Sequence, residues 1–255
     1  MPFLHRNNRA ELAADWQDLV ARHVSAWKLL DDQERAVLAT HLEVLVTTKR
    51  WEAAQGFELT DRVRTVIAAQ AALLVLELDL DHYRDVDSII VHPSTMRFDR
   101  TSQGPVPGTE VCGSVDLLGE ASFRGPVVIA WDSASAAARH PTRGHDVVLH
   151  EFAHKLDMLD GTVDGTPPLA DPDLRQRWIE ICTYEFDELA GSDGDTLIDN
   201  YGATDPGEFF AVVTETFFTL PTELEAMKPE LYDLFRAFYR QDPAARVRRH
   251  GRTLR

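Results

Sequence analysis

The chain has 255 residues, of which 44% are hydrophobic and 27% are charged, a composition typical of a folded globular protein and not of a disordered one. Its formal net charge is −16 at pH 7. This acidity argues against DNA or RNA as a direct partner, because binding to phosphates needs a basic field.

The cysteines and the apolar runs give an expectation for the compartment. Cys112 and Cys182 are far apart and form no C-x-x-C motif, which argues against a disulfide scaffold and for a reducing environment. The longest apolar run, residues 68–80, contains charged side chains and is too short to span a bilayer. We found no secretory signal. We therefore expect a cytoplasmic protein with no membrane partner.

Three helices are predicted in the first third of the chain. Apolar residues recur at spacings of three and four over residues 9–30 and again over 32–49, which gives each segment one apolar stripe. Thr60 has the character of an N-cap for a third helix that runs to about Glu77.

The middle of the chain has a β pattern. Residues 88–92 form a short apolar run before a proline, which suits a buried strand, and residues 125–132 are a second strand candidate. Glycines and prolines over 99–113 indicate an irregular loop. If Val127–Trp131 is an edge strand, it could pair with an extended peptide backbone. The pattern is equally consistent with an interior strand.

The second half returns to helical patterns. Helices are predicted at about 143–159, 172–190, 205–219 and 221–240, with connectors rich in Gly, Asp and Pro at 160–168 and 191–196. Helices around one short β region predict a mainly helical α+β fold with a small sheet.

The strongest chemical signal is the sequence H-E-x-x-H, formed by His150, Glu151 and His154. Four residues along a helix bring the two imidazoles to the same face, where both can reach one Zn²⁺ ion. Glu151 would lie near the metal without binding it, in a position to act as a general base on a water molecule. Apolar residues on both sides of the motif predict a buried helix, which makes a solvated surface helix the weaker alternative.

A catalytic zinc site needs a third protein ligand. The helix predicted at 205–219 is apolar nearly all round, so its carboxylates need a metal or a hydrogen-bond donor. Glu208 and Glu215 are seven residues apart on one stripe, and either could ligate while the other orients a histidine. An ordinary ion pair is the alternative for Glu215. Asp157, one turn past His154, could hold an imidazole N–H or be a surface residue.

Two motifs carry a resemblance to a known family. The run YGATDPGEFFAVVTETFF, together with HEFAHKLDMLDG and the W-x-A-A-x-G-F-x-L-T segment at 51–60, resembles the Mlc titration factor A family of zinc metallopeptidases. The same two motifs resemble the catalytic domain of anthrax lethal factor. The resemblance implies His150, His154 and Glu208 as zinc ligands, Glu151 as the base and Tyr201 as a second catalytic group. It therefore implies a zincin-like fold of the gluzincin type.

The resemblance also implies an activity and a partner. We expect an aminopeptidase-like hydrolase with one Zn²⁺ per chain, acting on a peptide or protein substrate and binding a glucose-responsive transcription repressor of the Mlc type. The alternative is a non-catalytic protein that sequesters a repressor, with a structural or vestigial zinc. We expect one compact domain over 1–255, with a helical part over about 1–80, a catalytic part over about 81–241 and a flexible tail over 242–255.

Overall fold

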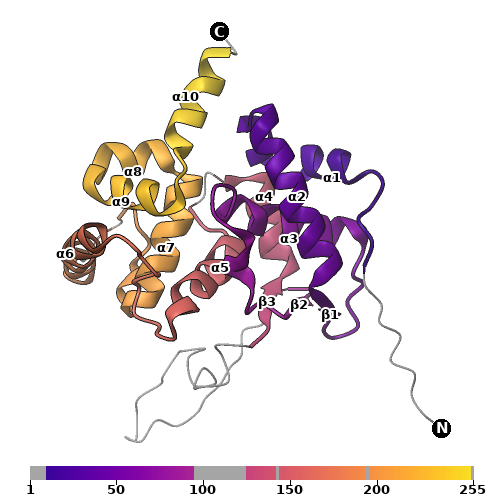
Figure 1. The fold of residues 1–255 in the computed structure, drawn as a ribbon, viewed down its shortest axis with the longest axis horizontal. Helices are drawn as coiled ribbons and strands as arrows, with labels where there is room; N and C mark the ends of the chain where they lie inside the picture. Colours follow the sequence, from indigo (N-terminus) through magenta and orange to yellow (C-terminus); the bar gives the residue numbers. More distant parts are fainter. Residues whose placement is uncertain (1–9, 95–124, 142–143, 193, 195, 254–255) are drawn as a thin grey trace, which may run out of the picture.

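The computed structural model describes residues 10–94, 125–141, 144–192, 194 and 196–253. Figure 1 shows a mainly helical α+β fold, with the N-terminal helices and a small sheet on one side and the helices of the second half on the other. Helices α5 and α7 lie between these two groups and pack against each other. The loop expected at 99–113 and Cys112 lie outside the described residues.

The N-terminal group contains two long helices and a broken one. Its members are α1 (Trp16–His23), the 3-10 helix η1 (Ser25–Leu29), α2 (Asp32–Thr48) and α3 (Asp61–Leu74). The continuous helix expected over 9–30 is wrong, because Val24 is extended and separates α1 from η1. The prediction for α3 is confirmed, since the Thr60 side chain accepts a hydrogen bond from the Val63 N–H.

The sheet has three parallel strands in the order β1-β2-β3, which are β1 (Arg50–Ala53), β2 (Ser88–His92) and β3 (Val127–Ala130). Strand β2 is confirmed, whereas β1 was not predicted. The second candidate strand is shorter than expected, because the chain turns into helix α4 (Trp131–Arg139) directly after Ala130. Among the described strands, β3 pairs only with β2, so it lies at an edge of this sheet.

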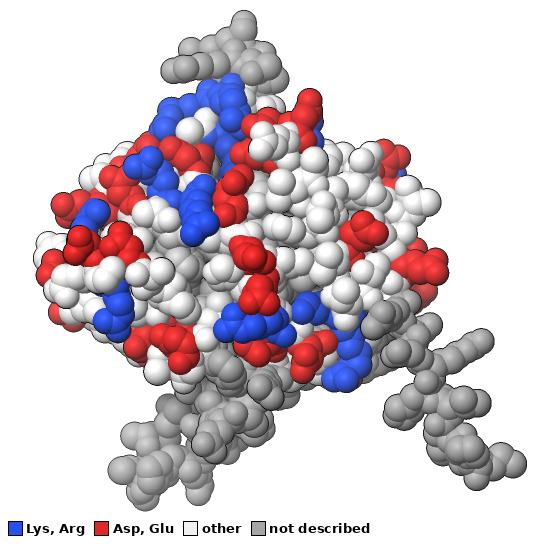
Figure 2. All heavy atoms as spheres, in the orientation of Figure 1, with Lys and Arg blue, Asp and Glu red and all other residues white. Residues whose placement is uncertain are grey.

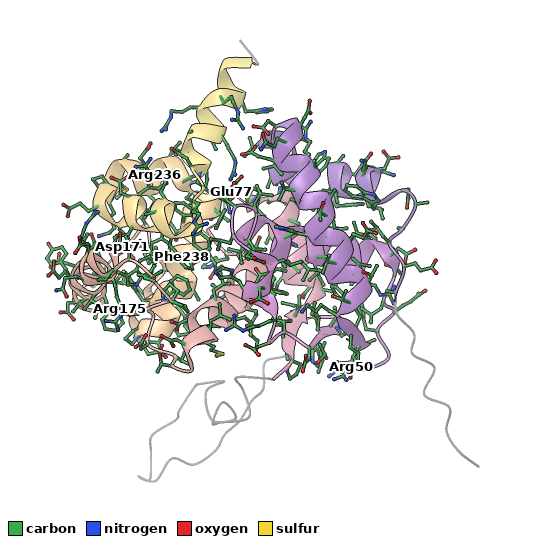
Figure 3. All side chains as sticks on the ribbon, in the orientation of Figure 1. Arg50, Glu77, Asp171, Arg175, Arg236 and Phe238 are labelled. Carbon is green, nitrogen blue, oxygen red and sulfur yellow. The ribbon has the colours of Figure 1, made fainter. Side chains whose placement is uncertain are left out.

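The second half is helical, as predicted. Its helices are α5 (Val147–Asp157), η5 (Met158–Asp160), α6 (Pro172–Ala190), η6 (Asn200–Ala203), α7 (Pro206–Thr219), α8 (Pro221–Met227), α9 (Pro229–Tyr239) and α10 (Pro243–Thr253). The single helix expected over 221–240 is instead the pair α8 and α9, which break at Lys228 because Pro229 follows it. Phe238 of α9, labelled in Figure 3, contacts the rings of Trp178 and Phe210 and so joins α6, α7 and α9 in one aromatic core.

Helix α10 occupies most of the segment that was expected as a tail. Its Arg246 is buried, with Nε 2.7 Å from the Glu34 carboxylate of α2 and a second nitrogen 2.8 Å from the Gln241 side-chain oxygen. The Gln241 amide in turn donates to the carbonyls of Leu73 and Leu74 at the end of α3. Basic side chains gather over α10 in Figure 2, although the chain as a whole is acidic. These contacts join the C-terminal helix to the N-terminal group.

No helix in the described part of the chain is both long and apolar enough to cross a bilayer. Cys182, on α6, is a free thiol that is partly buried against the core.

Candidate metal centre

Helix α5 begins at a cap that the sequence reading missed. Asp146 is buried, and its carboxylate accepts hydrogen bonds from the N–H groups of Val148 and Leu149 at 3.0 and 3.2 Å. Burial raises the pKa of Asp146 to about 7, against the opposing effect of these two hydrogen bonds. An aspartate directly before an apolar helical run is a recognisable N-cap signal, so Asp146 could have been found from the sequence.

The two histidines of α5 project from one face of the helix. Their Nε2 atoms are 3.2 Å apart, and the ring centroids are 4.8 Å apart in an edge-to-face arrangement. The opposite face of α5 is anchored by fully buried side chains, including Phe152 and Leu156. The predicted pairing of the imidazoles at one point is therefore present in the structure.

Helix α7 brings two carboxylates to opposite nitrogens of His150. Glu208 Oε2 lies 3.0 Å from His150 Nε2 and 3.5 Å from His154 Nε2. Glu215 Oε1 lies 2.8 Å from His150 Nδ1, and Glu215 Oε2 accepts a hydrogen bond from the Asp146 N–H. Seven residues apart on one helix, Glu208 faces the histidine pair and Glu215 supports His150 from behind. These contacts distinguish the roles of the two acids, which their spacing in the sequence could not do.

The facing atoms suit a divalent cation. Three ligands about 2.0–2.1 Å from a tetrahedral Zn²⁺ ion would be about 3.3 Å from one another, close to the observed 3.0, 3.2 and 3.5 Å. Glu208 Oε2 is buried and has no hydrogen-bond partner among the described residues. If the His150 Nδ1–H donates to Glu215, its Nε2 presents a lone pair to the Glu208 carboxylate, a repulsive arrangement unless a cation lies between them. His150, His154 and Glu208 form a group that could hold a metal ion.

Without a metal ion, the pKa values of His150 and Glu208 are shifted by their contacts with each other. Although burial lowers the pKa of His150, contacts with Glu208 and Glu215 raise it to about 10. Burial raises the pKa of Glu208, but the two imidazoles outweigh burial and hold it well below its usual range. The site is thus built for positive charge, which either protons or a metal ion can supply.

Glu151 is next to the histidine pair and only partly exposed. Burial raises its pKa, and the nearby His150 and His154 oppose that shift. One turn further along α5, the Lys155 ammonium donates to the carbonyl of Gly125 at 3.0 Å, two residues before β3. This hydrogen bond ties the segment that leads into β3 to the helix that carries Glu151.

Tyr201 comes from the 3-10 helix η6, where the Asp199 side chain accepts a hydrogen bond from its N–H at 2.8 Å. Tyr201 is 46% exposed, and its ring centroid lies 6.1 Å from that of His150. The structure thus brings Tyr201 to the edge of the histidine pair.

Asp157 is fully buried, so the surface alternative is wrong. Its Oδ2 accepts a hydrogen bond from the Gly165 N–H at 3.0 Å, while Oδ1 has no partner among the described residues. No described hydrogen bond links it to His154, as the histidine-orienting alternative would require. Gly165 also lies close to α7, because a Cβ there would be 2.2 Å from the carbonyl oxygen of Pro206. Asp157 therefore fixes the loop that covers the start of α7.

Comparison with known proteins supplies an independent line of evidence. A family model described as glucose-regulated metallo-peptidase M90 matches residues 4–240. Mlc titration factor A from Serratia proteamaculans is 32% identical over 261 residues, covering 97% of this chain and 95% of the relative. The protein of the same name from Yersinia enterocolitica is 31% identical over 254 residues, covering 94% and 90%. An uncharacterized protein from Synechocystis sp. is 36% identical over 238 residues, covering 91% and 86%.

Proposed function

The chain belongs to the glucose-regulated metallo-peptidase M90 family, and on that premise we propose that it is a zinc peptidase that hydrolyses peptide bonds. The observation that carries the proposal is the convergence of three metal-binding atoms from α5 and α7 on one point. When bound, Zn²⁺ would polarise the scissile carbonyl and lower the pKa of a water molecule to about 7. We treat residues 1–255 as one domain, which the contact between α2 and α10 supports.

In this proposal His150, His154 and Glu208 hold the metal, and Glu215 orients one ligand. The Glu215 carboxylate accepts the Nδ1–H of His150, which leaves the Nε2 lone pair directed at the metal position. The same carboxylate is itself fixed by the Asp146 N–H. A ligand held in this way loses little freedom on metal binding, which favours tight and specific coordination.

Two further side chains perform the proton chemistry. Glu151, whose pKa is raised by burial, takes the proton of the attacking water and passes it to the leaving amine. The Tyr201 hydroxyl donates a hydrogen bond to the oxyanion that develops on the substrate carbonyl. Its exposed ring beside His150 is consistent with a group that meets the substrate and not the core.

The free edge of β3 supports a peptide as the substrate. Val127 and Ile129 are buried while Val128 is 43% exposed, and the only described partner of this strand is β2. An extended peptide can add to such an edge through main-chain hydrogen bonds, which give affinity with little sequence preference. Aminopeptidase-like cleavage of short peptides is the form of this activity that the family resemblance favours.

The names of the relatives suggest a partner. Because two of them are called Mlc titration factor A, we include binding of an Mlc-type repressor in the proposal. We also propose a cytoplasmic location, which the sparse cysteines of the sequence favour. Sequestration of a repressor without catalysis is the competing function. A pull-down with the Glu151→Gln variant shows whether repressor binding needs the base, and peptide cleavage by the parent but not by this variant separates a peptidase from a pure sequestering protein.

The test of the peptidase proposal is the Glu151→Gln substitution. We expect the variant to keep its fold and to bind one equivalent of zinc, while kcat on a fluorogenic peptide falls about 10²–10⁴-fold. Zinc content by mass spectrometry and melting temperature are measured on the same preparation. Cleavage at the parental rate by a zinc-loaded variant would remove Glu151 from the chemistry.

A further inference from the structure

A pocket of about 360 Å³ opens beside the metal centre, on the side of His150 that faces Glu215. It lies between α4 and the start of α5. Its lining residues are Ser133, Ala136, Ala137, His140, His145, Val147, His150 and Glu215. No role in metal binding or proton transfer has been assigned to the α4 residues among them, so the pocket is a feature that the proposed chemistry leaves unexplained.

The pocket is empty of side chains because of the sequence of α4. Its three lining residues, Ser133, Ala136 and Ala137, are spaced by three and four from Ser133, so they form one face of the helix, and His140 follows directly after the helix. All three are serine or alanine, which are too short to fill the space in front of them. Another face carries Ala134 and Ala138, which are buried in the core. The small residues that face the pocket leave the space in front of them open.

The pocket lies next to the proposed reaction centre. His145 Nε2 lies 3.4 Å from the Asp199 carboxylate, and Asp199 caps the 3-10 helix that carries Tyr201. His150 is shared by the pocket wall and the metal group. A substrate carbonyl between Tyr201 and the metal position would therefore have an adjacent side chain within reach of the pocket.

The chemistry of the walls favours an apolar occupant. Ala136, Ala137 and Val147 offer only hydrocarbon, while the polar His140 and His145 of the lining are exposed to solvent. At the inner end, the oxygens of Glu215 are already engaged by His150 and by the Asp146 N–H, and their negative charge disfavours an acidic side chain. A volume of this size accommodates a leucine or an aromatic ring, and it falls within the range of ligand pockets in proteins.

We propose that this pocket receives a large apolar side chain, leucine or aromatic, from the residue of the peptide substrate that flanks the scissile bond. The inference rests on the proposed peptidase function and names the substrate class for it. Ala136 and Ser133 set the depth of the pocket and thereby the size of the side chain that it accepts.

The test uses quenched fluorescent peptides of one frame that carry Ala, Leu or Phe on either side of the scissile bond. The parent should show a higher kcat/KM for Leu and Phe than for Ala at one of these two positions. Ala136→Leu should lower kcat/KM for the Phe peptide about tenfold or more and leave the Ala peptide within about twofold. Ser135→Leu, on the same helix and equally half-buried but outside the pocket, should leave both unchanged. Ser133→Leu provides a second filling variant.

Zinc content and melting temperature of every variant show whether the site and fold are intact. A parent without size preference, or a filling variant that slows the Phe and Ala peptides equally, would overturn the pocket assignment while leaving the peptidase function standing. A zinc-loaded parent that cleaves no peptide in the series would instead overturn the peptidase function, and the pocket assignment with it.

Discussion

At the residue scale, the two acids of α7 have different partners, and this predicts different consequences of replacing them. Glu215→Gln keeps one oxygen for His150 but turns its NH₂ group toward the Asp146 N–H, so that two donors face each other. We expect zinc affinity to fall about 10–100-fold, a typical loss for a residue that orients a ligand. Competition with a chelator measures it, with Glu223→Gln on α8 as the control. An unchanged affinity would show that Glu215 does not orient His150.

Asp157 gives a pH-dependent prediction. Burial raises its pKa from 3.8 to about 7, despite the Gly165 N–H that favours the charged form. The folded protein therefore holds this proton more tightly than the unfolded chain, and the contribution of Asp157 to the free energy of unfolding falls as pH rises from about 4 to about 7.

Asp157→Asn removes this dependence. Relative to the parent, the variant should gain roughly 2–4 kcal/mol of stability between pH 4.5 and pH 8, with the difference growing as pH rises. Urea unfolding across this range measures it. A difference that is constant with pH would mean that Asp157 does not titrate as its burial implies.

The site residues show what sequence can and cannot supply. Positions 150, 151 and 154 follow from helical periodicity, because i and i+4 must share a face. Glu208 and Glu215 share a stripe, so spacing could not assign them, and only the motif resemblance selected Glu208 as a ligand. The capping role of Asp146 was within reach of the helix-start rules. The loop contact of Asp157 was not, since it depends on a backbone N–H eight residues away.

At the element scale, Gly165 joins three helices. Its backbone N–H donates to Asp157 at the end of α5, and its carbonyl accepts from the Trp178 indole of α6. It has a positive φ of +73°, and a Cβ there would clash with the Pro206 backbone at the start of α7. Gly161 has a φ of +96° with nothing within 4 Å of such a Cβ, which makes it a matched control.

Gly161→Ala should cost about 1–2 kcal/mol for the left-handed backbone alone. Gly165→Ala should cost about 1–3 kcal/mol more through the clash, and it should also weaken zinc binding because α7 carries Glu208. Chemical denaturation and zinc titration of both variants measure these effects. Equal losses in the two variants would show that the contact between the loop and α7 is unimportant.

Sequence patterns predicted long helices better than short elements. Helix α6 occupies the predicted range of 172–190, since a proline start and an apolar stripe mark it clearly. Strand β1 escaped notice because its four residues are mostly exposed and lack alternation, and its partner β2 lies far along the chain. The break at Lys228 was foreseeable from Pro229, whereas the extended Val24 carries no such signal.

At the scale of the whole molecule, α10 fastens the C-terminal end of the chain to the N-terminal helices. Arg246 is buried and donates to both Glu34 and Gln241. Arg246→Ala leaves the buried Gln241 oxygen without its donor, while Arg249 still pairs with Glu34, and it should cost about 1–3 kcal/mol. Arg248 pairs with Glu225 at the surface, where solvent screens the charges, so Arg248→Ala should leave the free energy of unfolding nearly unchanged. Urea unfolding compares the two. Similar small losses would mean that α10 is not held by this buried pair.

The metal centre lies where α5 and α7 meet, between the two groups of helices. One ion bound to both helices would bind the folded chain in preference to the unfolded one and so stabilise the whole molecule. The most direct measurement is anomalous diffraction at the zinc absorption edge from crystals grown with zinc. We expect one peak about 2.0–2.2 Å from His150 Nε2, His154 Nε2 and a Glu208 oxygen. A peak held by other residues, or no peak between α5 and α7, would contradict the account.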